Sequence, residues 1–345
     1  MKQQRGFTII ELMIAMAVML VVVVYLTEML TRQSRAYAVV DQVTEAQQNL
    51  RAIADLLERE LRVTGFLVPE GAAVCGVDQT NGSDVLFLSD ADALDPANEN
   101  QLGIGASIVA GFTGTGGNEN LTLDDKVLDG LPFYDTDGDG NADSDFLESV
   151  TPVRTGGVIV ADRGNPSRGV ACGLVTNVNS GGNIIRVDFT SNGAAPAGTP
   201  LGAGGGLSDL VAVPAHVYTV VNNQLLRDGM VLAEDVEDLQ LAFFYDTDGD
   251  GLEIGDDSDY PGSAGGPIYQ SGNWDNSELI EIRVNVVIRT RAQDADVVQN
   301  PGMAQGQWQT TENRVAPGGF DGFRRRVHTA TVRPRNVGIR PLGSV

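Results

Sequence analysis

Residues 7–26 read FTIIELMIAMAVMLVVVVYL, and this stretch decides how the chain is organised. Its length matches the roughly 20 apolar residues that an α-helix needs to cross a hydrocarbon core of about 30 Å. Lys2 and Arg5 precede it, and positive charges favour the cytoplasmic side of a membrane. After Leu26 the helical pattern continues without the small-residue cleavage site of a secretory signal peptide. We therefore predict a retained membrane anchor whose N-terminus lies in the cytoplasm.

Glu11 is the charged residue of this stretch. A lone carboxylate in a bilayer costs on the order of 3 kcal/mol, so a partner is expected for it. The residues from Gly6 to Leu12, GFTIIEL, resemble the processing site of type IV prepilins and type II secretion pseudopilins. The resemblance implies cleavage between Gly6 and Phe7, methylation of the new terminus, and pairing of Glu11 with the freed amine of Phe7 in the same subunit or a neighbour. The alternative is an ordinary single-pass anchor in which Glu11 is merely tolerated.

An amphipathic helix is predicted to continue the anchor. Apolar residues recur every three or four positions between Val39 and Leu61, which is the spacing of one helical face. No proline interrupts residues 7–63, and Gly65 is a typical stop, so the sequence predicts a rod of about 85 Å. We expect its apolar stripe to pack on a sheet of the same chain, with a coiled coil as the alternative.

Three parts follow from this pattern: a leader of residues 1–6, a helix of residues 7–64, and a β-rich head of residues 65–345 outside the cytoplasm. Within the helix, residues 7–26 are expected to be transmembrane and residues 27–64 amphipathic. The expected fold class is α+β, pilin-like, with this long membrane-spanning helix packed on an antiparallel sheet that carries long loops.

Alternating apolar and polar residues in Ile280–Ile288 predict a strand with one buried face and one wet face. Its buried face is expected to pack on Leu50–Leu61 of the helix. Asn222 and Asn223 predict a hairpin turn. The other strand candidates and the two arms of that hairpin are Val85–Leu88, Gly157–Val160, Ile184–Phe189, Val217–Val221, Gln224–Arg227, Leu239–Tyr245 and Arg324–Arg333.

The chain is strongly acidic, with a formal net charge of -23 over 345 residues. Such a surface repels nucleic acid and acidic lipid headgroups, and it attracts divalent cations. Cys75 and Cys172 are the two cysteines, and in an oxidising compartment we expect them to form a disulfide. It would close a loop of about one hundred residues and stabilise the fold by roughly 4–5 kcal/mol. The alternative is a pair of buried free thiols.

The segment FYDTDGDG occurs at residues 133–140 and again at residues 244–251. Alternate aspartates followed by a turn glycine are typical of the opening of a calcium loop, whose hard oxygen ligands suit Ca²⁺. We predict a structural Ca²⁺ at each copy, and the alternative is a pair of acidic turns. The expected ligands are Asp246, Asp248, Asp250, Leu252 through its carbonyl, and Asp257 in the second copy, and Asp135, Asp137, Asp139, Asn141, Asp143 and Asp145 in the first, where Glu148 could also complete the shell.

No catalytic site is nominated by the sequence. His216 and His328 are the two histidines, and neither lies in an H-E-x-x-H motif. A G-x-S-x-G nucleophile motif is absent as well. A pair of carboxylates that lie close together stays open as a catalytic arrangement.

Segments of the C-terminal half resemble PilW-family minor pilins: residues 236–251, the strand of residues 280–291, and the closing TATVRPRN at residues 329–336. The resemblance implies a low-copy subunit that helps to prime a type IV pilus. The implied partners are other major and minor pilins, a prepilin peptidase and the inner-membrane assembly platform. The head would lie outside the cytoplasm and later at the pilus surface.

Three alternatives stay open for the function. The first is a minor pseudopilin of type II secretion, and the second is a calcium-dependent adhesin or binding module on a pilin stem. The third is a tethered hydrolase. Pilus, secretion, ligand-capture and turnover assays respectively would separate them.

Calcium uptake gives a direct test of the repeated segment. Isothermal titration of the full-length protein in detergent should show calcium binding that weakens at least about tenfold in Asp248→Ala, because one carboxylate ligand is lost. Asp55→Ala removes an acid outside both segments and should bind calcium as the wild type does. Equal binding by Asp248→Ala and wild type would contradict the prediction.

Overall fold

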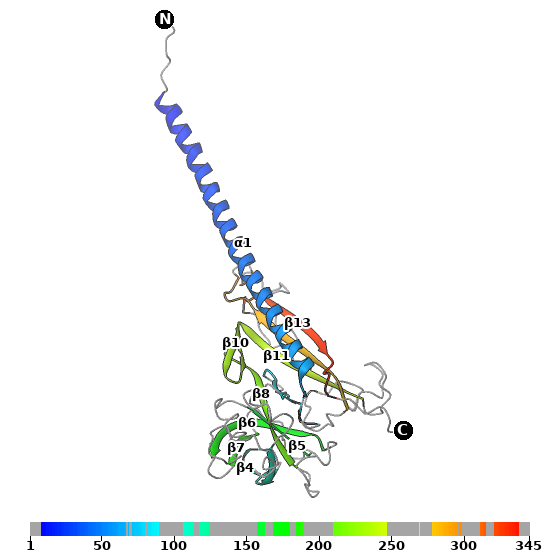
Figure 1. Cartoon of the computed structure of the whole chain (residues 1–345). Helices are drawn as coiled ribbons and strands as arrows, with labels where there is room; N and C mark the ends of the chain where they lie inside the picture. Colours follow the sequence, from blue (N-terminus) through cyan, green and yellow to red (C-terminus); the bar gives the residue numbers. More distant parts are fainter. Residues whose placement is uncertain are drawn as a thin grey trace, which may run out of the picture.

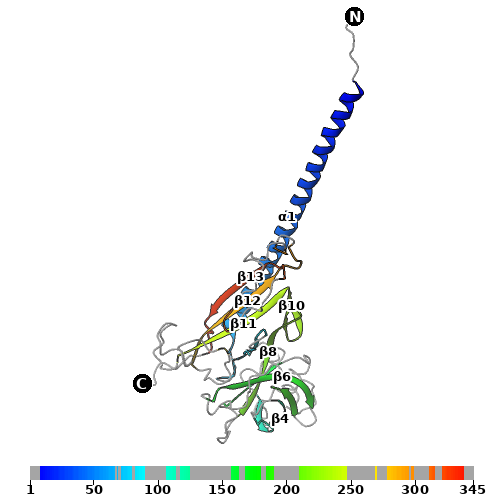
Figure 2. The same ribbon diagram turned by 180° about the vertical axis from the view of Figure 1, so that it is seen from behind.

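The computed structural model of the chain describes residues 8–66, 68, 71–79, 82–89, 106–113, 117–124, 157–162, 168–179, 184–189, 210–246, 269, 278–294, 297–298, 311–314 and 321–337. A long helix projects from a β-rich body, and the N-terminus lies at the free end of the helix (Figure 1). The lower half of the helix lies along the body, and the strands β4 to β7 lie at the end farthest from the N-terminus (Figures 1 and 2).

Helix α1 spans Ile9–Val63 without a break, as the lack of proline predicts. Thr8 caps its start, and Gly65 follows its end with a φ of +80°, a left-handed conformation that glycine adopts without strain. A Cβ at Gly65 would come within 2.9 Å of Val337 Cγ2, so the C-terminal segment packs against this turn. The buried stripe of α1 consists of Ala46, Leu50, Ile53, Ala54, Leu57 and Leu61.

A three-stranded antiparallel sheet receives this stripe. Its order is β11 (Val236–Tyr245), β12 (Leu279–Arg289) and β13 (Arg325–Val332). Ile282, Val284, Val286 and Ile288 of β12 belong to the same core cluster as the helix stripe. The predicted packing of this strand on residues 50–61 of the helix is therefore confirmed.

On β11 and β12 the other face is largely buried, so the predicted wet face is wrong there. Gln240 and Asn285 point away from the helix stripe yet are 0% and 5% exposed. The segments 82–84 and 311–314 cover them: Gln240 donates to the Gly82 carbonyl at 2.9 Å, and Asn285 donates to Glu312 at 2.5 Å. Polar side chains fit a buried face here because neighbouring segments supply hydrogen-bond partners.

The rest of the described body is a second, larger sheet. The sequence analysis predicted a single sheet, so the structure has one sheet more than predicted. The strands β8, β3, β4, β7, β6 and β5 pair in a ring, because β5 pairs with β8 as well as with β6. The ring is a closed barrel, which leaves these strands no unpaired sheet edge. Its strands are β3 (Ala106–Ala110), β4 (Asn118–Asp124), β5 (Gly157–Asp162), β6 (Val170–Asn179), β7 (Ile184–Asp188) and β8 (Leu210–Val221).

Strand β8 continues from the barrel toward the helix, where β2 (Val85–Leu88) and β9 (Gln224–Arg227) pair with it. Beyond them lie β1 (Val74–Val77) and β10 (Met230–Glu234). The turn between β8 and β9 has Asn222 at φ 52° and Asn223 at φ 61°. Two positive φ angles are the geometry of a tight hairpin turn, so the predicted hairpin is confirmed.

Cys75 of β1 and Cys172 of β6 form a disulfide, which is the pairing predicted, with their Cα atoms 6.2 Å apart. The two residues lie 97 positions apart in the chain, and both are fully buried. The bond therefore ties the barrel to the strands that lie next to the helix end.

Asp84 joins β2 to β11 through backbone contacts. Its carboxylate accepts hydrogen bonds from the N–H of Gln79 at 3.1 Å and of Leu241 at 2.8 Å. Burial raises the pKa of Asp84 to about 7, although these two hydrogen bonds lower it, and the nearby charges of Asp78 and Asp238 raise it further.

This pKa makes stability depend on pH. The folded pKa of Asp84 lies above its unfolded value. The stability that the protonated Asp84 adds to the folded state is therefore fully present below about pH 4 and is lost as the pH rises through 7. The free energy of unfolding should therefore fall by up to about 4 kcal/mol between these values. Unfolding followed by near-ultraviolet circular dichroism should show a smaller fall in Asp84→Asn, and an equal fall in both proteins would contradict the assignment.

Candidate assembly site on the N-terminal helix

The first turn of α1 places Glu11 directly under the helix start. The Thr8 N–H and the Thr8 hydroxyl each donate to Glu11 Oε2 at 2.9 Å, and the Glu11 N–H donates back to Thr8 Oγ1 at 3.3 Å. This reciprocal arrangement is a capping box, and it holds the carboxylate at the positive end of the helix dipole. The Glu11 carboxylate thus lies at the N-terminal end of α1.

Thr8 was not among the residues singled out from the sequence. The signal was present, because a threonine followed three positions later by a glutamate is the capping-box pattern. Gly6 and Phe7, the predicted cleavage pair, lie outside the described residues.

The helix beyond this turn presents apolar side chains on every side. Its most apolar 18-residue window has a mean hydropathy of 2.8, and none of that window is covered by the rest of the protein. By length and composition, α1 is the one helix among the described residues that could cross a membrane. Near Leu26 the surface changes: Thr27 donates to the Val23 carbonyl at 2.8 Å, and Glu28 and Arg32 form an exposed ion pair at 2.6 Å.

Polar contacts fix the lower half of α1 to the head. Glu60 pairs with Arg227 of β9 at 3.2 Å, and Glu45 pairs with Arg291 at 3.1 Å. At the helix end, the Asn336 side chain donates to the carbonyl of Val63 at 3.1 Å. Together these contacts fix the lower half of the helix to the head at three points along its length.

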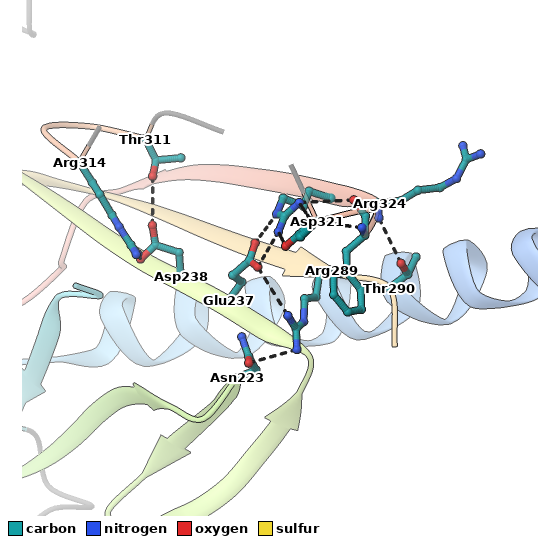
Figure 3. A network of polar contacts seen from close by, with 11 residues as sticks. Asn223, Glu237, Asp238, Arg289, Thr290, Thr311, Arg314, Asp321 and Arg324 are labelled. Carbon is teal, nitrogen blue, oxygen red and sulfur yellow. Dashed lines mark hydrogen bonds and ion pairs between the residues drawn. The ribbon is translucent and has the colours of Figure 1, made fainter. Parts of the chain in front are cut away.

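A buried ion-pair network supports the sheet under the helix (Figure 3). Arg325 of β13 donates to both carboxylate oxygens of Glu237, at 2.5 and 2.9 Å, and the side chains are 0% and 2% exposed. Arg325 also donates to Asp321 at 2.8 Å, while Arg289 of β12 lies 3.9 Å from Glu237. Burial lowers the pKa of Arg325, but hydrogen bonds to Asp321 and Glu237 outweigh it and raise that pKa above its usual value.

The same network reaches the neighbouring hairpin. Arg289 donates to the Asn223 side chain at 3.1 Å, so the β8–β9 turn is tied to β12 (Figure 3). Asp238, next to Glu237 in β11, pairs with Arg314 and accepts a hydrogen bond from Ser83 at 2.8 Å. Each of these charged side chains therefore has a partner of opposite charge.

Of the predicted calcium ligands, the structure describes one. Asp246 directly follows β11, and its N–H donates to the Glu278 carbonyl at 2.8 Å. The other predicted ligands, in both copies of the segment, lie outside the described residues. Within the described part of the chain, no three acidic, histidine or cysteine side chains gather as a metal site.

The two histidines have structural neighbours. His216 Nδ1 lies 2.5 Å from Asp228 Oδ2, and the other oxygen of Asp228 accepts the Val217 N–H at 2.8 Å. His328 Nε2 lies 3.7 Å from Glu58 of the helix. Each histidine therefore contacts a carboxylate that bridges two elements of the fold.

Comparisons with known proteins support the importance of the helix start. Residues 1–27 match the family model described as the prokaryotic N-terminal methylation motif. No curated protein matches the chain. Among solved structures, the type IV-like pilin TTHA1219 from Thermus thermophilus matches over 87% of this chain and 98% of that chain, at 10% identity and a TM-score of 0.30. A TM-score this low carries no argument, whereas the methylation motif covers the residues that form the capping box.

The buried ion pair gives a test of how the head is held together. Glu237→Gln leaves the Arg325 charge without one of its carboxylates and should lower the free energy of unfolding by about 3 kcal/mol. Glu28→Gln removes a carboxylate that pairs with Arg32 on the exposed surface of the same helix, and it should cost less than about 1 kcal/mol. Denaturant unfolding of both variants checks this, and equal losses would contradict it.

Proposed function

We propose that this chain is a type IV pilin-like subunit that is cut after Gly6 by a prepilin peptidase and then assembles with other subunits through α1. The observation that carries the proposal is the N-terminal methylation motif at residues 1–27, which includes the exposed apolar start of α1. In this proposal the helix first anchors the chain in the cytoplasmic membrane and later packs among the helices of neighbouring subunits.

The role of Glu11 follows from the geometry of the helix start. Its carboxylate already accepts the Thr8 N–H and hydroxyl at the N-terminal end of the helix. Cleavage after Gly6 would add a positive amine next to this carboxylate. Because a buried acid needs a partner, the amine of the same or a neighbouring subunit would neutralise Glu11 and set the depth of the helix in the bundle.

We assign the chain more narrowly to the minor pilins of the PilW type. The support is the sequence resemblance in residues 236–251, 280–291 and 329–336. The size of the head and the absence of a proline from the upper helix favour a low-copy subunit over the main filament subunit. Its partners would be other pilins and the inner-membrane assembly platform, and its head would lie outside the cytoplasm. The network of matched charges favours a structural role over an enzymatic one.

The second candidate within this class is a minor pseudopilin of type II secretion, which shares the same N-terminal signal.

Calcium at the two aspartate-rich segments would stabilise loops, as proposed from their sequence. The second segment would lie in the connection between β11 and β12, since Asp246 directly follows β11. A calcium-dependent adhesin on a pilin stem is compatible with the same features.

Processing and assembly can be tested separately. Gly6→Ala, co-expressed with a prepilin peptidase, should leave the full-length precursor, whereas wild type should lose the hexapeptide and begin at Phe7 in mass spectrometry. Glu11→Ala should be processed normally but enter filaments at least about tenfold less often. This is the effect of losing about 1.4 kcal/mol of free energy from the pairing of Glu11 with the terminal amine.

Glu28→Ala is the matched control, because Glu28 lies outside the apolar span and is paired with Arg32 on the exposed surface. It should be processed and incorporated like the wild type. Deletion of the gene, followed by imaging of pili and assay of secreted proteins, separates a pilus subunit from a secretion pseudopilin. A mature protein that begins anywhere other than Phe7 would refute the proposal.

A further inference from the structure

Within the described part of the chain, no strand pairs with the outer edge of β13. β13 pairs with β12 on one side and is the last strand of its sheet. The Thr290 N–H donates to the Arg324 carbonyl at 2.9 Å, and the Arg289 N–H donates to Asp235 on the opposite side. This alternation, continued through the register of β12 and β13, directs the backbone groups of Val327, Thr329 and Thr331 away from β12.

These outward groups are accessible to a partner. Val327 is 37% exposed, and Thr329 and Thr331 are exposed as well. Among the described residues, no backbone hydrogen bond reaches these three from outside the sheet. A row of free N–H and C=O groups along a strand is a template on which another extended chain can pair.

A groove of about 670 Å³ lies between this edge and α1. Leu50 and Ala54 line it from the helix, and Arg326, Val327 and His328 line it from β13. One wall is therefore helical and partly apolar, and the other is the open strand. The groove lies where the lower half of the helix runs along β13 (Figures 1 and 2).

The charge of the groove is opposite to that of the whole protein. Arg51 of the helix and Arg326 of β13 both line it, and within the described part of the chain neither makes an ion pair or a side-chain hydrogen bond. Asp55 is the acidic residue in the lining, so the two arginines leave the groove with one positive charge in excess. In a chain of net charge -23, this seam attracts acidic partners that most of the surface repels.

We propose that the groove between α1 and β13 binds an extended acidic segment of a neighbouring subunit, which adds to the β13 edge as a further strand. The open backbone selects an extended partner, and pairing along an edge supplies main-chain hydrogen bonds. The free arginines select acidic side chains, while Leu50 and Ala54 accept small apolar ones. The inference rests on the proposed function, because assembly is what would bring a neighbouring head beside this helix.

The test uses the full-length protein in detergent and a synthetic peptide of alternating valine and glutamate. The peptide has the eight-residue length of β13 and is blocked at both ends. Fluorescence anisotropy should show saturable binding of this peptide and no binding of the matching valine–lysine peptide. On binding, the amides of Val327, Thr329 and Thr331 should become protected from hydrogen exchange, since they acquire partners.

Two variants probe the charge and the backbone separately. Arg326→Glu should weaken binding of the acidic peptide at least about tenfold, because one charge pair is replaced by repulsion. Arg59→Glu changes an exposed helix arginine outside the groove and should bind as the wild type does. Val327→Pro removes one outward N–H and should weaken peptide binding by a similar factor. Val327→Ala keeps that N–H and should retain most of the wild-type affinity for the peptide.

Circular dichroism establishes that each variant is folded before binding is compared. The proposal fails if the acidic peptide does not bind, or if Arg326→Glu and Val327→Pro bind it as well as their controls do. If the peptide does not bind and sedimentation shows a dimer that Val327→Pro abolishes, the occupant is a second copy of the chain and not an acidic partner, and the proposal fails. Peptide binding needs no cleavage after Gly6, so a negative result here leaves the processing test of the proposed function untouched.

Discussion

The structure depends on one helix whose two halves need different surroundings. The upper half of α1 is apolar all round and is left exposed by the part of the chain that the structure describes, whereas the lower half buries a stripe from Ala46 to Leu61 on β12 and β13. A helix that is apolar on every side needs a lipid or a bundle of other helices around it, and an amphipathic helix needs a sheet. The single unbroken rod therefore joins two environments, and the head is fixed to a stem that assembly can use.

Rigidity at the lower end of this rod comes from specific contacts. Thr64 donates to the carbonyls of Ala73 and Ser89 at 3.2 Å, and Asn336 holds the last helical carbonyl of Val63. The buried pair of Glu237 and Arg325 then fixes β11 to β13 beneath the stripe. These contacts join the lower end of the helix to the sheet as one unit.

The sequence predicted those parts of the fold whose pattern is local. The helix, the strand of residues 280–288 and the Asn222–Asn223 turn follow from periodicity, from the absence of proline and from residues that accept positive φ. The strands β1, β3, β4, β6 and β10 were missed, because they are short or interrupted by glycine and gain their stability from the barrel and its neighbours.

The sequence also failed to show which polar residues are buried. Gln240 and Asn285 alternate as surface residues would, and their cover comes from segments far away in the chain. At the candidate site, Glu11 and the methylation signal were recognised from spacing, while the role of Thr8 needed the geometry of the cap. The groove beside β13 joins residues 44–55 to residues 326–328, and no local pattern links two segments so far apart.

The arrangement of the core also has a consequence for biosynthesis. The stripe of α1 is made first, whereas its partner strands β12 (Leu279–Arg289) and β13 (Arg325–Val332) come much later in the chain. Until both strands have been synthesised, the stripe has no native sheet to cover it. A chain truncated before β12 would therefore leave this apolar stripe uncovered.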